Sequence, residues 1–306
     1  MRPSCRQAED KPVTALVSRY GKPLTGLMIA LTAFWLIMMV ILPNLILFNF
    51  SFRPYLPVDQ LGGAKDVYTL ANYATFFDSP IHIQIFGLTV LYSSIVTFIC
   101  LVLAYPVAYF LAKVAQPKNA ASWFLVLLIP LWVSEVLRSF AWSIILAYQG
   151  PLNAMLHGLG ILDKPIRWRT GFNGVIIGLV YTYVLFMVFP IYNAIQSLDT
   201  NQIEAAQDLG APLWRIHWRV VMPHAKPGIG SGCIMVFMLS AGSILVPSIL
   251  GSTTSRWFTE IIQQWMFESL DWNTGAAYAF LLLVLCTVFV SVMMRLLNVR
   301  LVDVAK

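Results

Sequence analysis

Charged residues are scarce in this 306-residue chain, and two groups of them have a spacing that could do chemistry. In the first group, within residues 197–226, Glu204 and Asp208 lie four residues apart, and Arg215 and Arg219 repeat that interval. Side chains four apart share one face of a helix, so the segment predicts an acidic stripe followed by a basic stripe. Neither stripe pairs a nucleophile with a base, so the pattern favours docking of a partner over covalent catalysis.

The second group is Glu135 and Arg138, which fall near the middle of an apolar segment at residues 122–147. A bare charge inside a membrane costs about 2.5–3.5 kcal/mol on insertion scales, so it should face protein or water and have a partner. The two residues are three apart and could pair with each other on one helix face. Two interpretations therefore stay open: a structural ion pair, or side chains that line a solute path.

Other chemistry is not supported by the sequence. The four histidines are scattered without metal-ligand spacing, and we expect no metal site and no disulfide among the four cysteines. The phosphate-binding string G-x-x-x-x-G-K-[ST] does not occur, so ATP chemistry would have to reside on another polypeptide. The sequence therefore predicts a protein that is not an enzyme and binds no cofactor itself.

Long apolar segments must position these residues, since the chain is 58% hydrophobic and only 11% charged. A membrane-spanning helix needs about 20 apolar residues. Six segments meet this requirement, at about 24–48, 85–111, 122–147, 173–196, 227–250 and 275–297. They predict an all-α membrane protein with one six-helix domain over 24–297, between an N-terminal tail (1–23) and a C-terminal tail (298–306). The first segment is too long for a cleaved signal peptide.

The distribution of Lys and Arg predicts the orientation. With both termini inside, the inside segments hold 13 of the 20 basic residues and the outside segments six, with Arg138 within a span. The loop that carries Lys164, Arg167 and Arg169 opposes this bias. The excess still predicts cytoplasmic termini and a cytoplasmic segment at 197–226. The net charge of +6 then reflects topology and does not indicate nucleic-acid binding.

The segment 197–226 is expected to form a helical hairpin. Its first helix is expected from Ile203 to Leu209 and its second from Leu213 to Val221, with a turn at Gly210 between them. Pro223 is expected to terminate the second helix. The second helix has two apolar sides, so one side can pack on the spans while the other needs a partner. Those sides are expected to be Leu213, Ile216 and Val220, and Trp214, Trp218 and Val221. Attachment of the tryptophans to the membrane surface is the alternative.

Two further features concern the spans and the loops. Proline occurs inside five of the expected spans, at Pro43, Pro106, Pro130, Pro190 and Pro247. Each is expected either to kink its helix or to serve as a hinge. In the loop 148–172, apolar residues at helical spacing within PLNAMLHGLGIL predict a short helix lying against the membrane.

The hairpin sequence resembles the signature loop of the membrane permeases of ABC importers. The resemblance rests on Glu204-Ala205-Ala206, then Gly210 after three intervening residues, then Val220, Met222 and Pro223 after nine more. Its position between the fourth and fifth spans also agrees. The resemblance implies a MetI-like type I ABC importer permease fold, in which this loop docks on a separate ATPase subunit. A gradient-driven homodimeric carrier is the alternative from another class, but it would have no reason to keep the loop.

Further motifs resemble spermidine/putrescine-type permeases, and this resemblance covers about residues 20–300. They are Pro130-Leu131-Trp132-Val133-Ser134, Gly150-Pro151-Leu152-Asn153, Met187-Val188-Phe189-Pro190 and Val246-Pro247-Ser248-Ile249-Leu250-Gly251. The chain departs from that pattern where Ser243 and Ser248 stand in place of glutamates, and where Glu135 replaces an apolar residue. A polyamine or other organic cation is the favoured solute. A zwitterion such as an opine or a betaine, or a phosphonate, is the alternative.

The resemblance implies the following roles and partners. ATPase coupling would fall to Glu204, Ala205, Ala206, Asp208, Gly210, Trp214, Arg215, Arg219 and Pro223. The substrate path would include Trp132, Glu135, Arg138, Tyr183, Ser243 and Pro247. The partners would be a second permease subunit, two ATPase subunits that bind ATP and Mg²⁺, and a periplasmic binding protein, all at a bacterial inner membrane.

The orientation can be tested by labelling cysteines in a variant that lacks the native ones. A cysteine at Ser4 or Ala305 should resist an impermeant thiol reagent added to intact spheroplasts, whereas one at Ser252 should react, since positive residues favour cytoplasmic termini. Labelling of both termini from outside would overturn the assignment.

Overall fold

The computed structural model describes residues 21–56, 60, 63, 66–252 and 254–297, and the regular secondary structure of these residues is helix without any strand. The tails predicted at 1–23 and 298–306 lie almost entirely outside this range. The elements below include π-helical turns, labelled η, in which the chain widens to i→i+5 hydrogen bonds. An all-helical structure fits a membrane setting, because a helix satisfies its own backbone hydrogen bonds.

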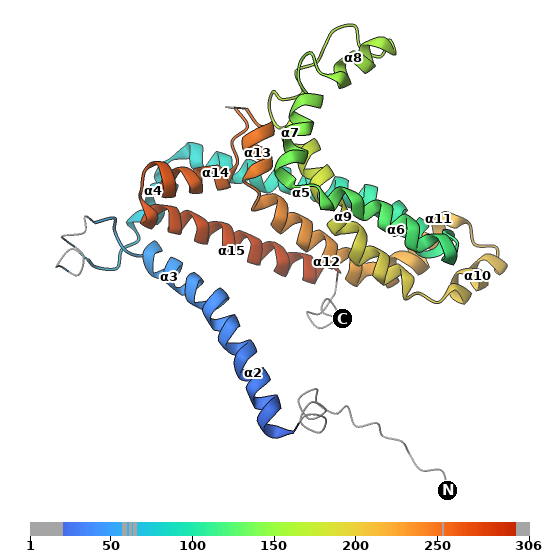
Figure 1. The fold of residues 1–306 in the computed structure, drawn as a ribbon, viewed down its shortest axis with the longest axis horizontal. Helices are drawn as coiled ribbons and strands as arrows, with labels where there is room; N and C mark the ends of the chain where they lie inside the picture. The colour runs from blue at the N-terminus through green and yellow to red at the C-terminus, as the bar shows by residue number, and fades with distance from the viewer. Residues whose placement is uncertain (1–20, 57–59, 61–62, 64–65, 253, 298–306) are drawn as a thin grey trace.

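The first half of the chain forms long helical runs (Figure 1). The first joins α2, η1 and α3, the second joins α5 and η3, and the third is divided between α6 and α7. The bounds are α2 Lys22–Leu36, η1 Ile37–Ile41, α3 Leu42–Ser51, α4 Ala71–Asp78, α5 Pro80–Tyr109, η3 Phe110–Val114, α6 Pro117–Trp132, α7 Glu135–Ile145 and α8 Pro151–Gly158.

The second half contains the hairpin and the remaining long helices. The bounds are α9 Asn173–Gln196, α10 Thr200–Asp208, α11 Leu213–Ile216, η4 His217–Val221, α12 Met222–Ala241, α13 Leu245–Leu250, α14 Phe258–Gln263, η5 Gln264–Glu268 and α15 Trp272–Leu297. The hairpin elements α10 and α11 lie at one end of the bundle, and α4 and α14 lie at the other (Figure 1).

Four helical runs within the described residues are long and apolar enough to cross a membrane: Lys22–Ser51, Pro80–Val114, Asn173–Gln196 and Trp272–Leu297. They agree with the first, second, fourth and sixth expected spans. The third expected span is a broken one, because Ser122–Trp132 and Glu135–Ile145 meet at 85°. The prediction that Glu135 and Arg138 lie mid-helix is therefore wrong, since Val133 and Ser134 adopt extended backbone and Glu135 begins α7.

The fifth expected span, 227–250, is also not one continuous helix. Helix α12 ends at Ala241, and α13 begins at Leu245. Two side chains from the following segment bind carbonyls at this break: Trp257 Nε1 donates to Ser240 O at 3.1 Å, and Thr259 Oγ1 donates to Ser243 O at 2.6 Å. These bonds take the place of helical ones and stabilise the interruption.

The core is formed by α5, α9 and α12, which pack side by side. Val96, Leu179, Met187, Ile191 and Val236 are completely buried there. Helices α9 and α12 approach closely at Gly228, where an added Cβ would lie 2.4 Å from Pro190 O. The missing side chain allows the two backbones to meet.

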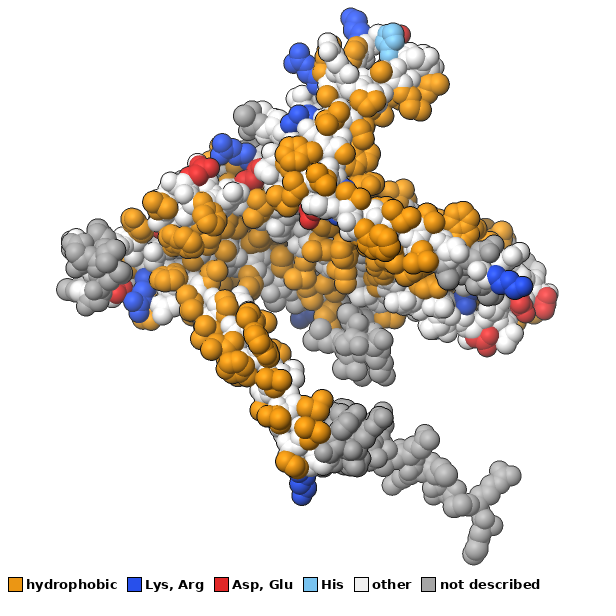
Figure 2. All heavy atoms as spheres, in the orientation of Figure 1, with side chains coloured by type: hydrophobic (Ala, Val, Ile, Leu, Met, Phe, Trp, Pro, Cys, Tyr) orange, Lys and Arg blue, Asp and Glu red, His pale blue; other side chains and the backbone are white. Residues whose placement is uncertain are grey.

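Helices α2 and α3 extend away from this core (Figure 1), and only 6% of their most apolar window is buried. Their surface is covered with apolar side chains (Figure 2). The run is fixed at its α3 end, where the rings of Phe48 and Phe280 lie 5.4 Å apart and Asn273 Nδ2 donates to Arg53 O. An exposed apolar helix of this length needs lipid or another membrane helix around it.

The helix expected in the loop 148–172 is present as α8. Asn153, a buried residue of α8, holds the loop, because its side chain donates to Ile166 O and accepts from Trp168 Nε1. Met155 remains exposed on the helix. Attachment of α8 to the membrane surface remains a prediction.

Replacing Gly228 with alanine should destabilise the bundle. The new methyl group would collide with Pro190 O and with Ala194 Cβ, 2.6 Å away, and overpacking of this kind costs about 1–3 kcal/mol. The measurement is the thermal midpoint and folded yield in detergent. Gly87→Ala is the matched control, because nothing lies within 4 Å of its Cβ position. Equal stability of the two variants would contradict the proposed close approach.

Candidate functional site

The hairpin at one end of the bundle begins with a capped helix. The Asp199 side chain accepts a hydrogen bond from Asn201 N at 3.0 Å, which is a typical N-cap for α10. The turn that follows contains Gly210 at φ 75°, a conformation that favours glycine. The two-helix hairpin and the glycine turn predicted from the sequence are therefore present, although the first helix begins earlier, at Thr200.

The predicted end of the second helix at Pro223 is wrong. The helix continues from α11 through the π turn η4 into α12, so that Pro223 lies in the first turn of α12 and is exposed. The π turn immediately before it changes the hydrogen-bond pattern at the point where proline lacks an N–H. The hairpin is thus joined to the bundle by uninterrupted helix.

The π turn also changes which residues face inward. Ile216 and Val221 are buried, and they are five residues apart, as the wider turn requires. Leu213 is exposed. The prediction that Leu213 shares a side with Ile216, and Val221 a side with the tryptophans, assumed regular α-helical spacing and is wrong.

The outer surface of the hairpin combines apolar and ionic side chains. Leu209 is 88% exposed, and Trp214 and Trp218 are also largely exposed. The charged residues predicted for coupling, Glu204, Asp208, Arg215 and Arg219, are all exposed, as is Ala205, whereas Ala206 is half-buried. Among the described residues the ion pair within 4.0 Å is Arg53–Asp66, so these four charges are not paired with one another. Charged side chains gather at this end of the molecule (Figure 2).

A second group of polar residues surrounds the break between α6 and α7. Glu135 Oε1 accepts a hydrogen bond from Tyr183 on α9, at 3.1 Å. Its position as the first residue of α7 suits a carboxylate, because the N-terminal end of a helix is positive. The Glu135–Arg138 ion pair, one of the two interpretations left open by the sequence, is absent from the described residues, since Glu135 reaches across to α9 instead.

Arg138 and Ser243 complete this group, which we call the kink cluster (Glu135, Arg138, Tyr183 and Ser243). Tyr183 interacts electrostatically with both Glu135 and Arg138, and Ser243 lies beside it. Arg138 Nε and Ser243 Oγ are buried, and neither has a hydrogen-bond partner among the described residues. The structure thus brings together four of the six residues predicted for the substrate path.

The other two residues lie apart from the kink cluster. Trp132, the last residue of α6, is 79% exposed and projects from the break. Pro247 is buried in α13, and it lines a pocket between α13 and α14.

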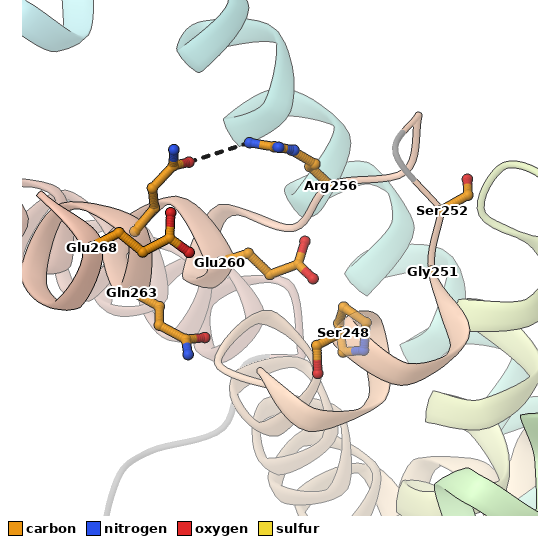
Figure 3. Close-up of a pocket in the computed structure, with 9 residues that line it drawn as sticks. Ser248, Gly251, Ser252, Arg256, Glu260, Gln263 and Glu268 are labelled. Carbon is orange, nitrogen blue, oxygen red and sulfur yellow. Dashed lines mark hydrogen bonds between the residues drawn. The ribbon is translucent and has the colours of Figure 1, made fainter.

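We call this pocket the outer pocket, because the distribution of Lys and Arg predicts that it lies outside the membrane. It has a volume of about 530 Å³ and a largely polar wall. Glu260 points from α14 toward the side formed by Ser248 and Gly251 (Figure 3). The lining consists of Pro247, Ser248, Gly251, Ser252, Arg256, Glu260, Gln263, Gln264 and Glu268. Sequence analysis missed the acidic residues of this pocket, because Glu260 and Glu268 fall in a loop whose fold brings them to Pro247.

Two charged side chains of the outer pocket make hydrogen bonds within the protein, and a third is exposed. Arg256 Nη1 donates to Gln264 Oε1 at 3.2 Å, and Glu260 Oε2 accepts from Trp257 N at 2.8 Å. Burial raises the pKa of the Glu260 carboxyl, and the hydrogen bond from Trp257 opposes that shift. Glu268 is exposed at the rim. The pocket lining has two acidic side chains and one arginine, a balance that favours binding of a positively charged solute.

The described residues contain no group of three side chains that could hold a metal ion. The hydrogen bond of the kink cluster joins a tyrosine hydroxyl to a carboxylate. Polar groups at a helix break and exposed charges on the hairpin suit binding of a solute and of a partner.

Comparisons with known proteins agree with this arrangement. Residues 104–303 match the family model described as "Binding-protein-dependent transport system inner membrane component". The chain is 35% identical to the spermidine/putrescine transport system permease protein PotB of Salmonella typhimurium (strain SL1344), over 89% of this chain and 94% of that protein. The identity to PotB of Escherichia coli (strain K12) is 37%, over 79% and 86% of the two chains.

The fold is also found in a solved structure. A chain of the bacterial alginate ABC transporter, in complex with an alginate pentasaccharide-bound periplasmic protein, superposes with a TM-score of 0.71. The sequence identity is 18%, and the match covers 94% of this chain and 99% of that one. This chain is therefore a multi-pass membrane protein that belongs to the family of binding-protein-dependent transport system inner membrane components.

Proposed function

We propose that this chain is the permease subunit of an ATP-driven importer for a polyamine such as spermidine or putrescine, or for a related organic cation. The observation that carries the proposal is the identity of 35% to a spermidine/putrescine permease along 89% of the chain. The acidic outer pocket and the carboxylate of Glu135 supply the negative groups that an ammonium would need.

The proposed path begins at the outer pocket and continues to the kink cluster. Pro247 lines the pocket, and its helix α13 packs on α7, which begins with Glu135. Tyr183 fixes one carboxylate oxygen of Glu135, which leaves the other oxygen for a cation. The 85° break lets α6 and α7 move as separate segments while the solute passes.

The proposed complex contains a second permease subunit, two ATPase subunits and a periplasmic binding protein. ATP and Mg²⁺ would be bound by the ATPase subunits, since the chain lacks the phosphate-binding string. The exposed tryptophans and charges of the hairpin are the surface on which an ATPase would dock. With cytoplasmic termini, the hairpin faces the cytoplasm and the outer pocket faces the binding protein.

A zwitterionic solute is the second candidate. Arg138 Nε is buried without a hydrogen-bond partner in the described residues, and it could meet an acidic group while Glu135 meets an amine. The gradient-driven carrier is not favoured by the family match.

The direct experiment is reconstitution of the complex in proteoliposomes with its partner subunits and its binding protein. Spermidine or putrescine should stimulate ATP hydrolysis and enter the vesicles, whereas glycine betaine should do neither. Stimulation by betaine alone would move the assignment to the zwitterion.

Gly210→Val should uncouple transport while the protein remains in the membrane. Nothing lies within 4 Å of the Cβ position, so the effect arises from the left-handed backbone, which costs about 1–2 kcal/mol for other residues. Uptake should fall about tenfold for this cost. Gly160→Val is the matched control, because Gly160 has a similar φ of 68° outside the hairpin. Full uptake by Gly210→Val at normal expression would refute the coupling role.

Glu135→Gln should lower spermidine uptake about tenfold or more, because it removes the charge that meets the cation. Protein amount and basal ATP hydrolysis should persist. Tyr183→Phe removes the hydrogen bond to Glu135 but keeps the carboxylate, so its loss of uptake should be smaller. Uptake by Arg138→Gln should be unchanged or higher for a cation, and an equal loss in both charge variants would favour the zwitterion.

A further inference from the structure

A polar contact joins the hairpin to the core helix α5. The Tyr105 hydroxyl lies 2.9 Å from His217 Nδ1, within hydrogen-bond distance. The ring of Tyr109, one turn further along α5, lies against the imidazole with centroids 4.4 Å apart. His217 is half-buried, whereas its neighbours Arg215 and Arg219 are exposed, so its side chain is the polar one of this segment that faces the bundle.

The protonation state of His217 fits this contact. Burial lowers the pKa of His217, so the ring is neutral at neutral pH. A neutral imidazole has one donor and one acceptor nitrogen, and a tyrosine hydroxyl can serve either one. The contact therefore needs no counter-charge.

The contact lies where two helices widen. His217 is the first residue of η4, and Tyr109 directly precedes η3. A π turn interrupts the regular hydrogen-bond pattern of the helix, and such turns are frequent at helix kinks and at functional sites. A displacement of α11 could be lost by bending at η4 before it reached α12, unless a second connection held the turn.

The other polar side-chain contacts that the structure describes for the hairpin lie at its entrance and its exit. Lys113 Nζ donates to Leu198 O. Ser197 Oγ lies 3.0 Å from His224 Nε2. Both contacts lie outside the segment that carries the exposed tryptophans, so neither holds the π turn itself.

We propose that the Tyr105–His217 pair transmits the displacement of the docked hairpin to α5, and thus that His217 is a positioning residue for coupling. The inference rests on the proposed function, because it requires an ATPase docked on the hairpin. Helix α5 packs with α9, which carries Tyr183 of the kink cluster. A hairpin held to α5 at η4 therefore moves the wall of the solute path instead of bending alone.

The test compares two variants that each remove one hydroxyl group from α5. Tyr105→Phe loses the hydroxyl that meets His217, whereas Tyr109→Phe loses a hydroxyl with no hydrogen bond among the described contacts and keeps its ring against the imidazole. The full complex is reconstituted, and uptake of radiolabelled spermidine per ATP hydrolysed is measured beside basal ATP hydrolysis and thermal midpoint.

Tyr105→Phe should lower uptake per ATP about fivefold, the usual effect of one lost hydrogen bond, while Tyr109→Phe stays near wild type. His217→Phe should lower it equally, and the double variant should be no worse than either single change. His217→Asn, which keeps a hydrogen-bonding group near the Nδ1 position, should restore part of the loss. Rescue of this kind distinguishes coupling from support of the fold.

The inference is overturned if Tyr105→Phe lowers the thermal midpoint but leaves uptake per ATP unchanged, or if the two single losses add in the double variant. Should Tyr105→Phe reduce the amount of complex, the comparison of His217→Asn with His217→Phe decides in the same way. Failure of the unaltered complex to take up spermidine would refute the proposed solute. The variants would then be compared with the solute that the complex does transport.

Discussion

The structure depends on one constraint, which is that a backbone in hydrocarbon must satisfy its own hydrogen bonds. The long apolar segments among the described residues are therefore helical, and they contain few irregular positions. Neighbouring side chains can compensate for such an irregularity. At the end of α12, for example, Trp257 and Thr259 bind the carbonyls that the helix leaves free.

The same irregular positions carry the polar groups. The break at Val133 and Ser134 places Glu135 at the start of a helix, and the break after Ala241 leaves Ser243 near Tyr183. Two interrupted helices thus meet α9 and concentrate polar side chains inside an apolar bundle. Uninterrupted helices would have presented neither a helix start nor an unpartnered hydroxyl at this depth.

Sequence reasoning predicted the elements whose signal is local. Apolar length located Asn173–Gln196 to the residue, and the composition of the turn predicted the strained backbone of Gly210. It failed where packing decides. Residues 122–147 appear continuous in composition, and only the contact between α7 and α9 shows why Glu135 prefers Tyr183 to Arg138.

The same reasoning could not place Glu260 and Glu268 beside Pro247, because a loop sequence does not encode which helix end it will face. The π turn η4 was equally hidden, since a five-residue interval between Ile216 and Val221 appears only after the turn has widened. Pro223 gave a local signal for an irregularity, and the error lay in interpreting it as the end of a helix.

The hairpin surface and the kink cluster lie apart in the fold, so coupling between them needs a rigid connection. Helices α9 and α12 meet through Gly228 against Pro190, without side chains that could act as a compressible layer between them. Tightly packed interfaces shift between discrete arrangements and deform little. A force applied at the hairpin would therefore move α5, α9 and α12 together, and the hinge would be the break at Val133 and Ser134, where the backbone leaves the helical conformation.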